Sequence, residues 1–300
     1  MEHRGLDAYG YFEREGSLGQ VRAEFKEVVA AARERTAEAY GRRLHSAYLY
    51  GSVPRGTARP GRSGLDLLLA LHHEPAAEDG DAAEVLARGL DEDFPQILGA
   101  TIPLYGKETL LSEQERFGLG WFLACLCTPL LGADLAEHLP RYRPDSLLAR
   151  ETNGDLADVL PTWRAKARAA SSPDEYRALS RAFARRLLRT GFTLVMPRWG
   201  GWTSDLAESA EVFGTYYPQR AAQMRAAAAV AVHPVADPAV LHGYIEDLGP
   251  WLADEYTARH GTKTPRERGW PPGLPQDFPA TSRDSTASLA SARPAPVIRR

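Results

Sequence analysis

The spacing of hydrophobic residues divides the chain into an N-terminal part with strands and helices and a longer, helical part. Apolar residues recur at helical spacing through 20–44, which predicts an amphipathic helix. Short apolar runs at 47–50 and 65–71 predict strands, and the second run is almost wholly aliphatic, as expected of a strand buried on both faces. A further helix is expected from 79 to about 90. A third strand is expected at 95–105, at a sheet edge because a glycine and a proline interrupt it.

From Ser112 onward the pattern predicts helices almost without interruption. An apolar segment at 117–131 and an amphipathic helix at 175–190 come first. A Ser-Asp pair at 204–205 is typical of a helix N-cap, and another helix is expected from 238 or 239 to 256. The fold class we expect is therefore α+β: a mixed α/β unit with a small, mostly mixed sheet flanked by helices, followed by an all-α bundle.

This pattern predicts three segments along the chain. Residues 1–110 form the α/β domain, and residues 111–261 form the helical domain. The remaining residues, 262–300, hold seven of the 22 prolines together with many Ser, Thr and Arg residues, a composition that predicts disorder.

Composition narrows the classes of protein but does not choose among them. The net charge is −3, and the last 39 residues carry seven basic and three acidic side chains, so the body of the protein is acidic. An acidic body does not indicate a general nucleic-acid-binding protein. The sequence shows no signal peptide and no apolar run long enough to cross a bilayer, which predicts a cytoplasmic protein.

Cys125 and Cys127 lie in an apolar run, two residues apart, a spacing that disfavours a disulfide between them. We therefore expect both to be buried thiols.

The candidate chemistry is concentrated between the two predicted strands. Gly51-Ser52 follows the first strand, and a glycine there lets backbone N–H groups come close to phosphate oxygens. The intervening loop carries Arg55, Arg59 and Arg62, whose guanidinium groups can neutralise phosphate charge. The second strand begins with a carboxylate, Asp66.

This stretch resembles the signature of the polymerase-β superfamily of nucleotidyltransferases: Gly-Ser, about a dozen residues, then Asp-x-Asp on a strand. The layout is similar to that of the two-domain aminoglycoside adenylyltransferases. By this resemblance Gly51, Ser52, Arg55, Arg62 and Ser63 would bind nucleotide phosphates. Asp66 would be the catalytic metal ligand.

The chain departs from the signature at one position. Gly64 stands where the superfamily has its first metal-binding aspartate, and the segment 95–105, where a third carboxylate is expected, contains no Asp or Glu. Because Mg²⁺ is held by carboxylates and phosphate oxygens, we expect it to be held weakly. Losing a metal ligand of this kind costs several kcal/mol of transition-state stabilisation, or roughly a thousandfold in rate.

Three other features could belong to a site. In antibiotic nucleotidyltransferases, which the layout resembles, a carboxylate of the helical part activates the acceptor hydroxyl; the candidates here are Glu113, Glu115 and Asp134. Arginines recur every four residues from Arg177 to Arg189, as expected of a solvated helix face or, alternatively, of a basic ridge facing a cleft. The sequence Trp199-Gly-Gly-Trp202 indicates aromatic side chains packed between helices, or a surface on which a ligand stacks.

The function these features predict is transfer of a nucleoside monophosphate from an NTP, expected to be ATP, to a hydroxyl of a small, antibiotic-like acceptor, with release of pyrophosphate. Mg²⁺ is the expected cofactor. The alternative is a catalytically weak or inactive nucleotide-binding protein of the same fold, which regulates a partner. A protein-modifying transferase is a third class, but such enzymes usually lack so long a helical domain. A monomer or a dimer is equally compatible with the sequence.

Overall fold

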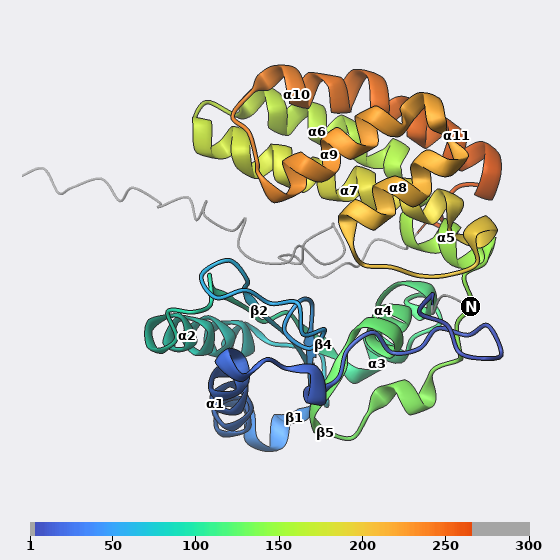
Figure 1. Cartoon of the computed structure of the whole chain (residues 1–300). Coiled ribbons are helices and arrows are strands. Elements are labelled where there is room, and N and C mark those ends of the chain that lie inside the picture. Colours follow the sequence, from blue (N-terminus) through green and yellow to red (C-terminus); the bar gives the residue numbers. More distant parts are fainter. Residues whose placement is uncertain (1–3, 266–300) are drawn as a thin grey trace, which may run out of the picture.

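The computed structural model describes residues 4–265 and consists of a sheet with its covering helices, below a bundle of helices (Figure 1). We call residues 18–138 the sheet unit and residues 146–260 the helical bundle. The strands are β1 (Leu44–Tyr50), β2 (Leu65–Leu71), β3 (Ala100–Thr101), β4 (Leu104–Gly106) and β5 (Thr128–Gly132). The sheet unit has the helices α1 (Ala23–Tyr40), α2 (Ala77–Asp93), α3 (Lys107–Leu111) and α4 (Trp121–Leu126).

The helical bundle is built around its longest helix. It contains α5 (Ser146–Asn153), α6 (Leu156–Ala169), α7 (Pro173–Trp199), α8 (Leu206–Tyr216), α9 (Ala221–Val232), α10 (Pro238–Gly243) and α11 (Gly249–His260). A π-helical turn, Tyr244–Leu248, joins the last two. Trp163 of α6 stacks on Phe183 of α7 with ring centroids 4.1 Å apart. Such aromatic pairs add to the free energy gained by burying the rings.

The sheet is mixed, as predicted. Its strand order is β3-β2-β1-β5, with β4 also paired to β2. β1 runs antiparallel to β2 and β5, whereas β3 and β4 run parallel to β2. The predicted α+β class, a small mixed sheet flanked by helices and followed by a helical bundle, is therefore confirmed.

The alternation of side chains along β2 divides the interior into two cores. Leu65, Leu67 and Leu69 are buried with the apolar faces of α1 and α2. Leu68 and Ala70 point to the other side, where the core continues through α4 into the helical bundle. Because side chains on a strand alternate with a period of two, Asp66 lies on the second side, toward the bundle.

The structure corrects the prediction in the 117–131 segment. This apolar run lies in the part predicted to be almost wholly helical, but α4 ends at Leu126 and residues 128–132 form β5 beside β1. Pro129 cannot donate a helical hydrogen bond, and the free edge of β1 offers strand pairing instead. The sheet therefore extends beyond the predicted domain boundary at 110, and the division of the chain into domains remains a prediction.

The other predicted elements differ mainly at their ends. The third predicted strand is divided into β3 and β4, with Pro103 between them. The predicted helix at 175–190 is part of α7, which continues to Trp199. The last turns of α7 are buried inside the bundle, with residues such as Leu194 and Met196, so they lack the amphipathic pattern from which the helix was predicted. Asp205 caps α8, its side chain accepting a hydrogen bond from the Glu208 N–H at 2.8 Å.

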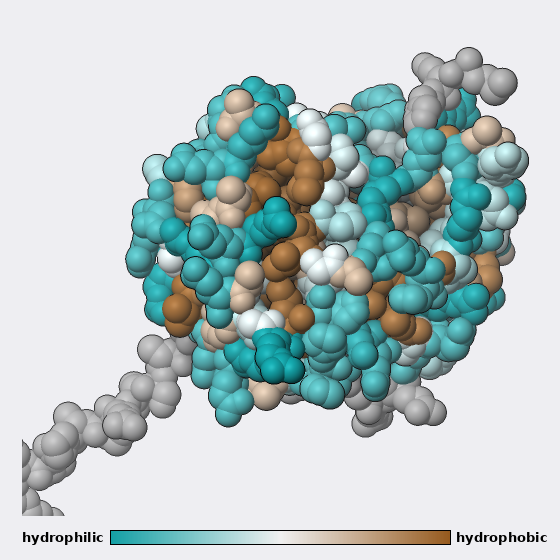
Figure 2. Space-filling view, turned by 90° about the horizontal axis from the view of Figure 1, so that it is seen from below, coloured by the Kyte–Doolittle hydropathy of each residue, from teal (hydrophilic) through white to brown (hydrophobic). Residues whose placement is uncertain are grey.

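Seen from below, the molecule presents a mainly hydrophilic surface with a band of hydrophobic residues across it (Figure 2). Within residues 4–265 we find no helix with the length and hydrophobicity that crossing a membrane would need.

The structure describes residues 262–265 of the C-terminal segment that the sequence predicts to be disordered. There the backbone N–H of Lys263 donates to Gly154 O at 3.1 Å. Residues 266–300, the rest of that segment, lie outside the described residues.

Candidate functional site

A cavity of about 300 Å³ lies between the sheet unit and the helical bundle. We call it the central pocket. It is lined by all six residues that the sequence indicates as phosphate or metal ligands: Gly51, Ser52, Arg55, Arg62, Ser63 and Asp66. Gly64 lines it as well. The loop between β1 and β2 therefore brings these residues to one place, although their roles remain predictions.

The turn after β1 is fixed by its own backbone. Gly51 has φ +79°, a left-handed conformation that favours glycine. The Arg55 Nε donates to Gly51 O at 2.9 Å, and the Ser52 carbonyl accepts hydrogen bonds from the N–H groups of Thr57 and Ala58, both at 3.1 Å. These bonds hold the turn in shape at the wall of the pocket before any ligand arrives.

The two loop residues nearest the second strand differ in their surroundings. Arg62 is exposed and lines the pocket from the loop. The Ser63 hydroxyl accepts a hydrogen bond from the Arg59 N–H at 2.9 Å, so part of its bonding capacity maintains the loop. Arg59 itself does not line the pocket.

Asp66 is buried at the base of the pocket. Only 3% of its surface is exposed, and it lies opposite Tyr50 of β1 in the sheet. Burial raises the pKa of the Tyr50 hydroxyl well above its ordinary value, and the charge of Asp66 raises it further. Tyr50 is therefore a neutral phenol at this end of the sheet.

The pocket does not fit the two magnesium ions that nucleotidyl transfer generally uses. Gly64 offers no ligand, and Thr101 stands beside Asp66 on the neighbouring β3. Over residues 4–265 the structure has no cluster of three or more His, Cys, Asp or Glu side chains suited to a metal. In the stretch from Gly51 to Asp66, Asp66 carries the one carboxylate that could hold a metal ion.

Two further carboxylates, Glu15 and Glu151, line the pocket. Glu15 precedes the first helix; its carboxylate accepts from the Ser204 hydroxyl at 2.6 Å and lies 3.5 Å from Arg55 Nη1. Glu151 of α5 is paired with Arg150 at 2.8 Å. Neither is among the residues predicted from the sequence, because they lie far from the motif along the chain and only the packing of the two units brings them close.

The three carboxylates considered as general bases lie elsewhere, and none of them lines the pocket. Glu113 is mostly exposed and pairs with Arg116 at 2.8 Å. The buried Glu115 accepts a hydrogen bond from the Leu119 N–H at 3.3 Å, closing a π-helical turn. Asp134 pairs with Arg14 at 2.8 Å and caps a short helical turn. Each therefore has a structural partner away from the cavity.

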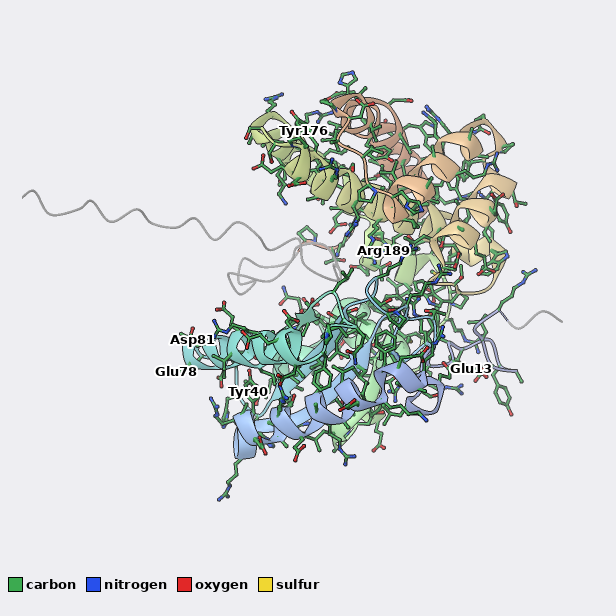
Figure 3. All side chains as sticks on the ribbon, turned by 60° about the vertical axis from the view of Figure 1, so that its left-hand side comes forward. Glu13, Tyr40, Glu78, Asp81, Tyr176 and Arg189 are labelled. Atoms are coloured by element: carbon green, nitrogen blue, oxygen red, sulfur yellow. The ribbon has the colours of Figure 1, made fainter. Side chains whose placement is uncertain are left out.

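The arginine ridge of α7 is divided between solvent and pocket. Arg177, near the start of the helix, is half exposed and pairs with Asp174 at 2.7 Å, as expected for a solvated face. Arg185 and Arg189, two and three turns further along, line the pocket. Figure 3 shows Arg189 at the junction of the bundle and the sheet unit. The solvated interpretation thus fits the beginning of α7 and is wrong for these two residues.

Aromatic rings form the wall of the pocket beside α7. Trp202 lines the cavity and meets Trp121 edge to face, with ring centroids 5.0 Å apart; its ring is 5.5 Å from that of Phe192. Trp199, in contrast, does not line the pocket and packs on Phe192 at 5.6 Å. Of the predicted pair, one ring is therefore structural and the other is both structural and accessible to a ligand.

The N-terminal segment connects the two units at the pocket. The backbone N–H of Trp202 donates to Arg4 O at 2.8 Å, and the backbone N–H of Glu15 donates to Cys125 O at 2.9 Å.

Cys125 and Cys127 are buried and unbridged, as predicted, and burial raises the pKa of both thiols. They are therefore inert thiols at neutral pH.

Comparison with known proteins adds little. The chain matches no known family model and no curated protein sequence. Among solved structures it is similar to the crystal structure of spectinomycin adenyltransferase AAD(9) from Enterococcus faecialis with ATP and spectinomycin. The TM-score is 0.48 and the identity 11%, over 77% of this chain and 98% of that chain. An overlap of this size carries no argument about function, which must rest on the pocket itself.

Proposed function

We propose that this protein is a nucleotidyltransferase-like protein whose central pocket binds a nucleoside triphosphate beside a small, hydroxyl-bearing molecule. One observation carries the proposal. The Gly51-Ser52 turn, Arg55, Arg62 and Asp66, which the sequence marks as a nucleotide site, line a single cavity that the helical bundle closes from above.

The charge of the cavity supports an anionic ligand. Five basic side chains line it: Arg55, Arg62, Arg185, Arg189 and Lys263. The acidic side chains number three: Asp66, Glu15, which pairs with Arg55, and Glu151, which pairs with Arg150 outside the lining. Lys263 is paired with Asp155, which does not line the cavity. An excess of guanidinium groups beside the Gly51-Ser52 turn is suited to phosphate oxygens.

The bundle side of the cavity supports a second ligand. Aromatic rings such as Trp202 lie near polar side chains that include Asn153 and Thr193. Asn153 Nδ2 donates to the Thr193 hydroxyl at 3.1 Å, so these groups are held in place. Apolar walls with a few fixed polar groups are typical of small-molecule sites.

In the proposed reaction an acceptor hydroxyl attacks the α-phosphorus of the nucleotide. The new oxygen–phosphorus bond forms as the bond to pyrophosphate breaks, and the hydroxyl proton passes to a base. Glu15 and Glu151 are the carboxylates of the pocket, besides Asp66, that could accept this proton. The arginines neutralise the charge on the phosphates, and the loop turn holds them in line.

The second candidate is a nucleotide-binding protein that transfers weakly or not at all. The observation that favours it is the scarcity of metal ligands around Asp66, which has glycine two residues before it and threonine beside it. The two candidates share the bound nucleotide and differ in whether pyrophosphate is released.

Both candidates can be tested with the full chain and four NTPs. Nucleotide binding is measured by calorimetry, and pyrophosphate release is followed with a panel of hydroxyl-bearing acceptors. Asp66→Asn removes the charge at the pocket floor, and Asp81→Asn makes the same change on α2, where Asp81 is exposed and lies at the far side of the sheet unit (Figure 3). Both variants are compared with the unaltered chain.

Release of pyrophosphate that Asp66→Asn abolishes and Asp81→Asn retains would support transfer. Binding without release, whatever the acceptor, would favour the second candidate. If no NTP binds, both candidates are wrong.

A further inference from the structure

Two arginines of α7 line the pocket that also contains Gly64 and Asp66. We infer that Arg185 and Arg189 neutralise the nucleotide phosphates in place of a divalent cation, so that the pocket binds a nucleoside triphosphate without a metal ion. This inference rests on the proposed nucleotide binding and adds to it a statement about which groups supply the positive charge.

The geometry of α7 directs both side chains into the cavity. They are four residues apart, so they lie on one face of the helix, about one turn from each other. The opposite face is anchored in the bundle by the buried residues Phe183 and Leu187. The next residue, Arg186, is buried and paired with Asp155. These contacts fix the rotation of the helix and hence the direction of the two arginines.

Guanidinium groups reach the cavity from both units. Arg55 and Arg62 belong to the loop of the sheet unit, and Arg185 and Arg189 come from the bundle above. A planar guanidinium can donate two parallel hydrogen bonds to a phosphate, and it remains charged at any pH at which the protein is folded. A triphosphate between these two walls would meet positive charge on both sides.

Arg185 and Arg189 line the same cavity as Gly64 and Asp66. The bundle therefore brings positive charge to a pocket whose loop carries one carboxylate where the signature has two.

This assignment reverses the usual effect of magnesium. In a carboxylate-lined site Mg²⁺ joins the phosphates to the protein, and chelating it releases the nucleotide. In a site lined by arginines Mg²⁺ competes with the guanidinium groups for the phosphate oxygens. We therefore expect ATP to bind at least as tightly in EDTA as in the presence of Mg²⁺.

The first test uses the unaltered full chain. ATP is titrated by calorimetry in EDTA and again with excess MgCl₂, and the fluorescence of Trp121 and Trp202 in the pocket wall gives a second readout. The expected affinity in EDTA is equal to that with Mg²⁺, within about threefold, or higher. This comparison requires no variant to fold.

The second test uses variants of α7. Arg185→Ala and Arg189→Ala are each expected to weaken ATP binding in EDTA about tenfold or more, since hydrogen bonds to charged groups are the stronger kind. Arg189→Lys keeps the charge but loses the forked geometry, and an intermediate loss is expected. The matched control is Arg177→Ala, a residue of the same helix and ridge that is half exposed and outside the pocket. Thermal unfolding midpoints are measured for all four variants.

The outcomes separate this inference from the proposed function. ATP binding that requires Mg²⁺ and is lost in EDTA would overturn the inference and leave nucleotide binding intact. The inference is equally wrong if the pocket variants bind ATP as the Arg177→Ala control does. ATP binding in neither condition would overturn the proposed function together with the inference.

Discussion

Substituting aspartate at Gly64 should make nucleotide binding depend on magnesium. Gly64 is buried, lies one residue before β2 and lines the pocket together with Asp66. The substitution rebuilds an Asp-x-Asp pair with Cα atoms about 7 Å apart. Two carboxylates at this spacing can share a bound ion, whereas without an ion they face the phosphates with like charge.

The size of the effect follows from the position of the new charge. A carboxylate about 6 Å from a phosphate charge, at an effective dielectric constant of about 20, is repelled by about 3 kcal/mol. This corresponds to roughly a hundredfold weaker binding of ATP in EDTA. Mg²⁺ should restore most of the lost affinity, and it should raise metal-dependent pyrophosphate release if the remaining residues suffice for transfer.

The assay is ATP titration of Gly64→Asp in EDTA and in Mg²⁺. Gly80→Asp is the control: it adds the same charge to the sheet unit, in the first turn of α2, outside the pocket and with open space around the new Cβ. The unfolding midpoint reports whether the buried substitution is tolerated. If folded Gly64→Asp binds ATP in EDTA as tightly as the control does, the phosphates do not lie beside position 64 and the reasoning is refuted.

The remaining predictions concern the folded scaffold. Asp155→Asn leaves the buried Arg186 without its counter-charge and should lower the free energy of unfolding by about 3 kcal/mol in denaturant titration. The control is Asp158→Asn, at an exposed residue, which should change it little. Equal effects of the two substitutions would contradict the pairing. Burial acts to raise the pKa of Asp155, but Arg186 and Lys263 outweigh it and hold the pKa below 3.8. The pair's contribution to the free energy of unfolding is therefore complete above pH 3.8 and is lost as the pH falls through the folded-state pKa. Acid unfolding curves of the unaltered protein and of Asp155→Asn should converge at low pH. Gly56 and Gly61 have nearly the same positive φ, +71° and +70°, but a Cβ at Gly56 would lie 2.8 Å from Gln20 O while a Cβ at Gly61 would face open space. Gly61→Ala should therefore lower the free energy of unfolding by about 1 kcal/mol, and Gly56→Ala by clearly more. Similar losses of unfolding midpoint would show that the close contact at Gly56 relaxes.

The site could be predicted to the extent that its residues are local. The loop from Gly51 to Asp66 joins two neighbouring strands, so its residues are brought together by the β1–β2 pairing alone. Glu15 and Glu151 could not be found in this way, because nothing near them in the sequence marks them as site residues. Residue 15 reaches the pocket through hydrogen bonds to Cys125 and Ser204, more than a hundred residues away. The three carboxylates chosen for their place after the sheet unit have partners elsewhere.

Pattern and propensity determined the kinds of elements in this protein. The aliphatic run at 65–71 is a strand because it is buried on both faces, and the Ser204-Asp205 pair marks the start of a helix through its capping oxygen. The sequence by itself also determined that the metal-binding half of the motif is depleted, since no packing can supply a side chain to Gly64. Only the tertiary structure decided that residues 128–132 pair with β1 as a strand and that the ridge of α7 is half solvent and half pocket wall. The physical reason is that burial and charge depend on what packs opposite a residue, and for α7 that partner is a loop more than a hundred residues earlier in the chain.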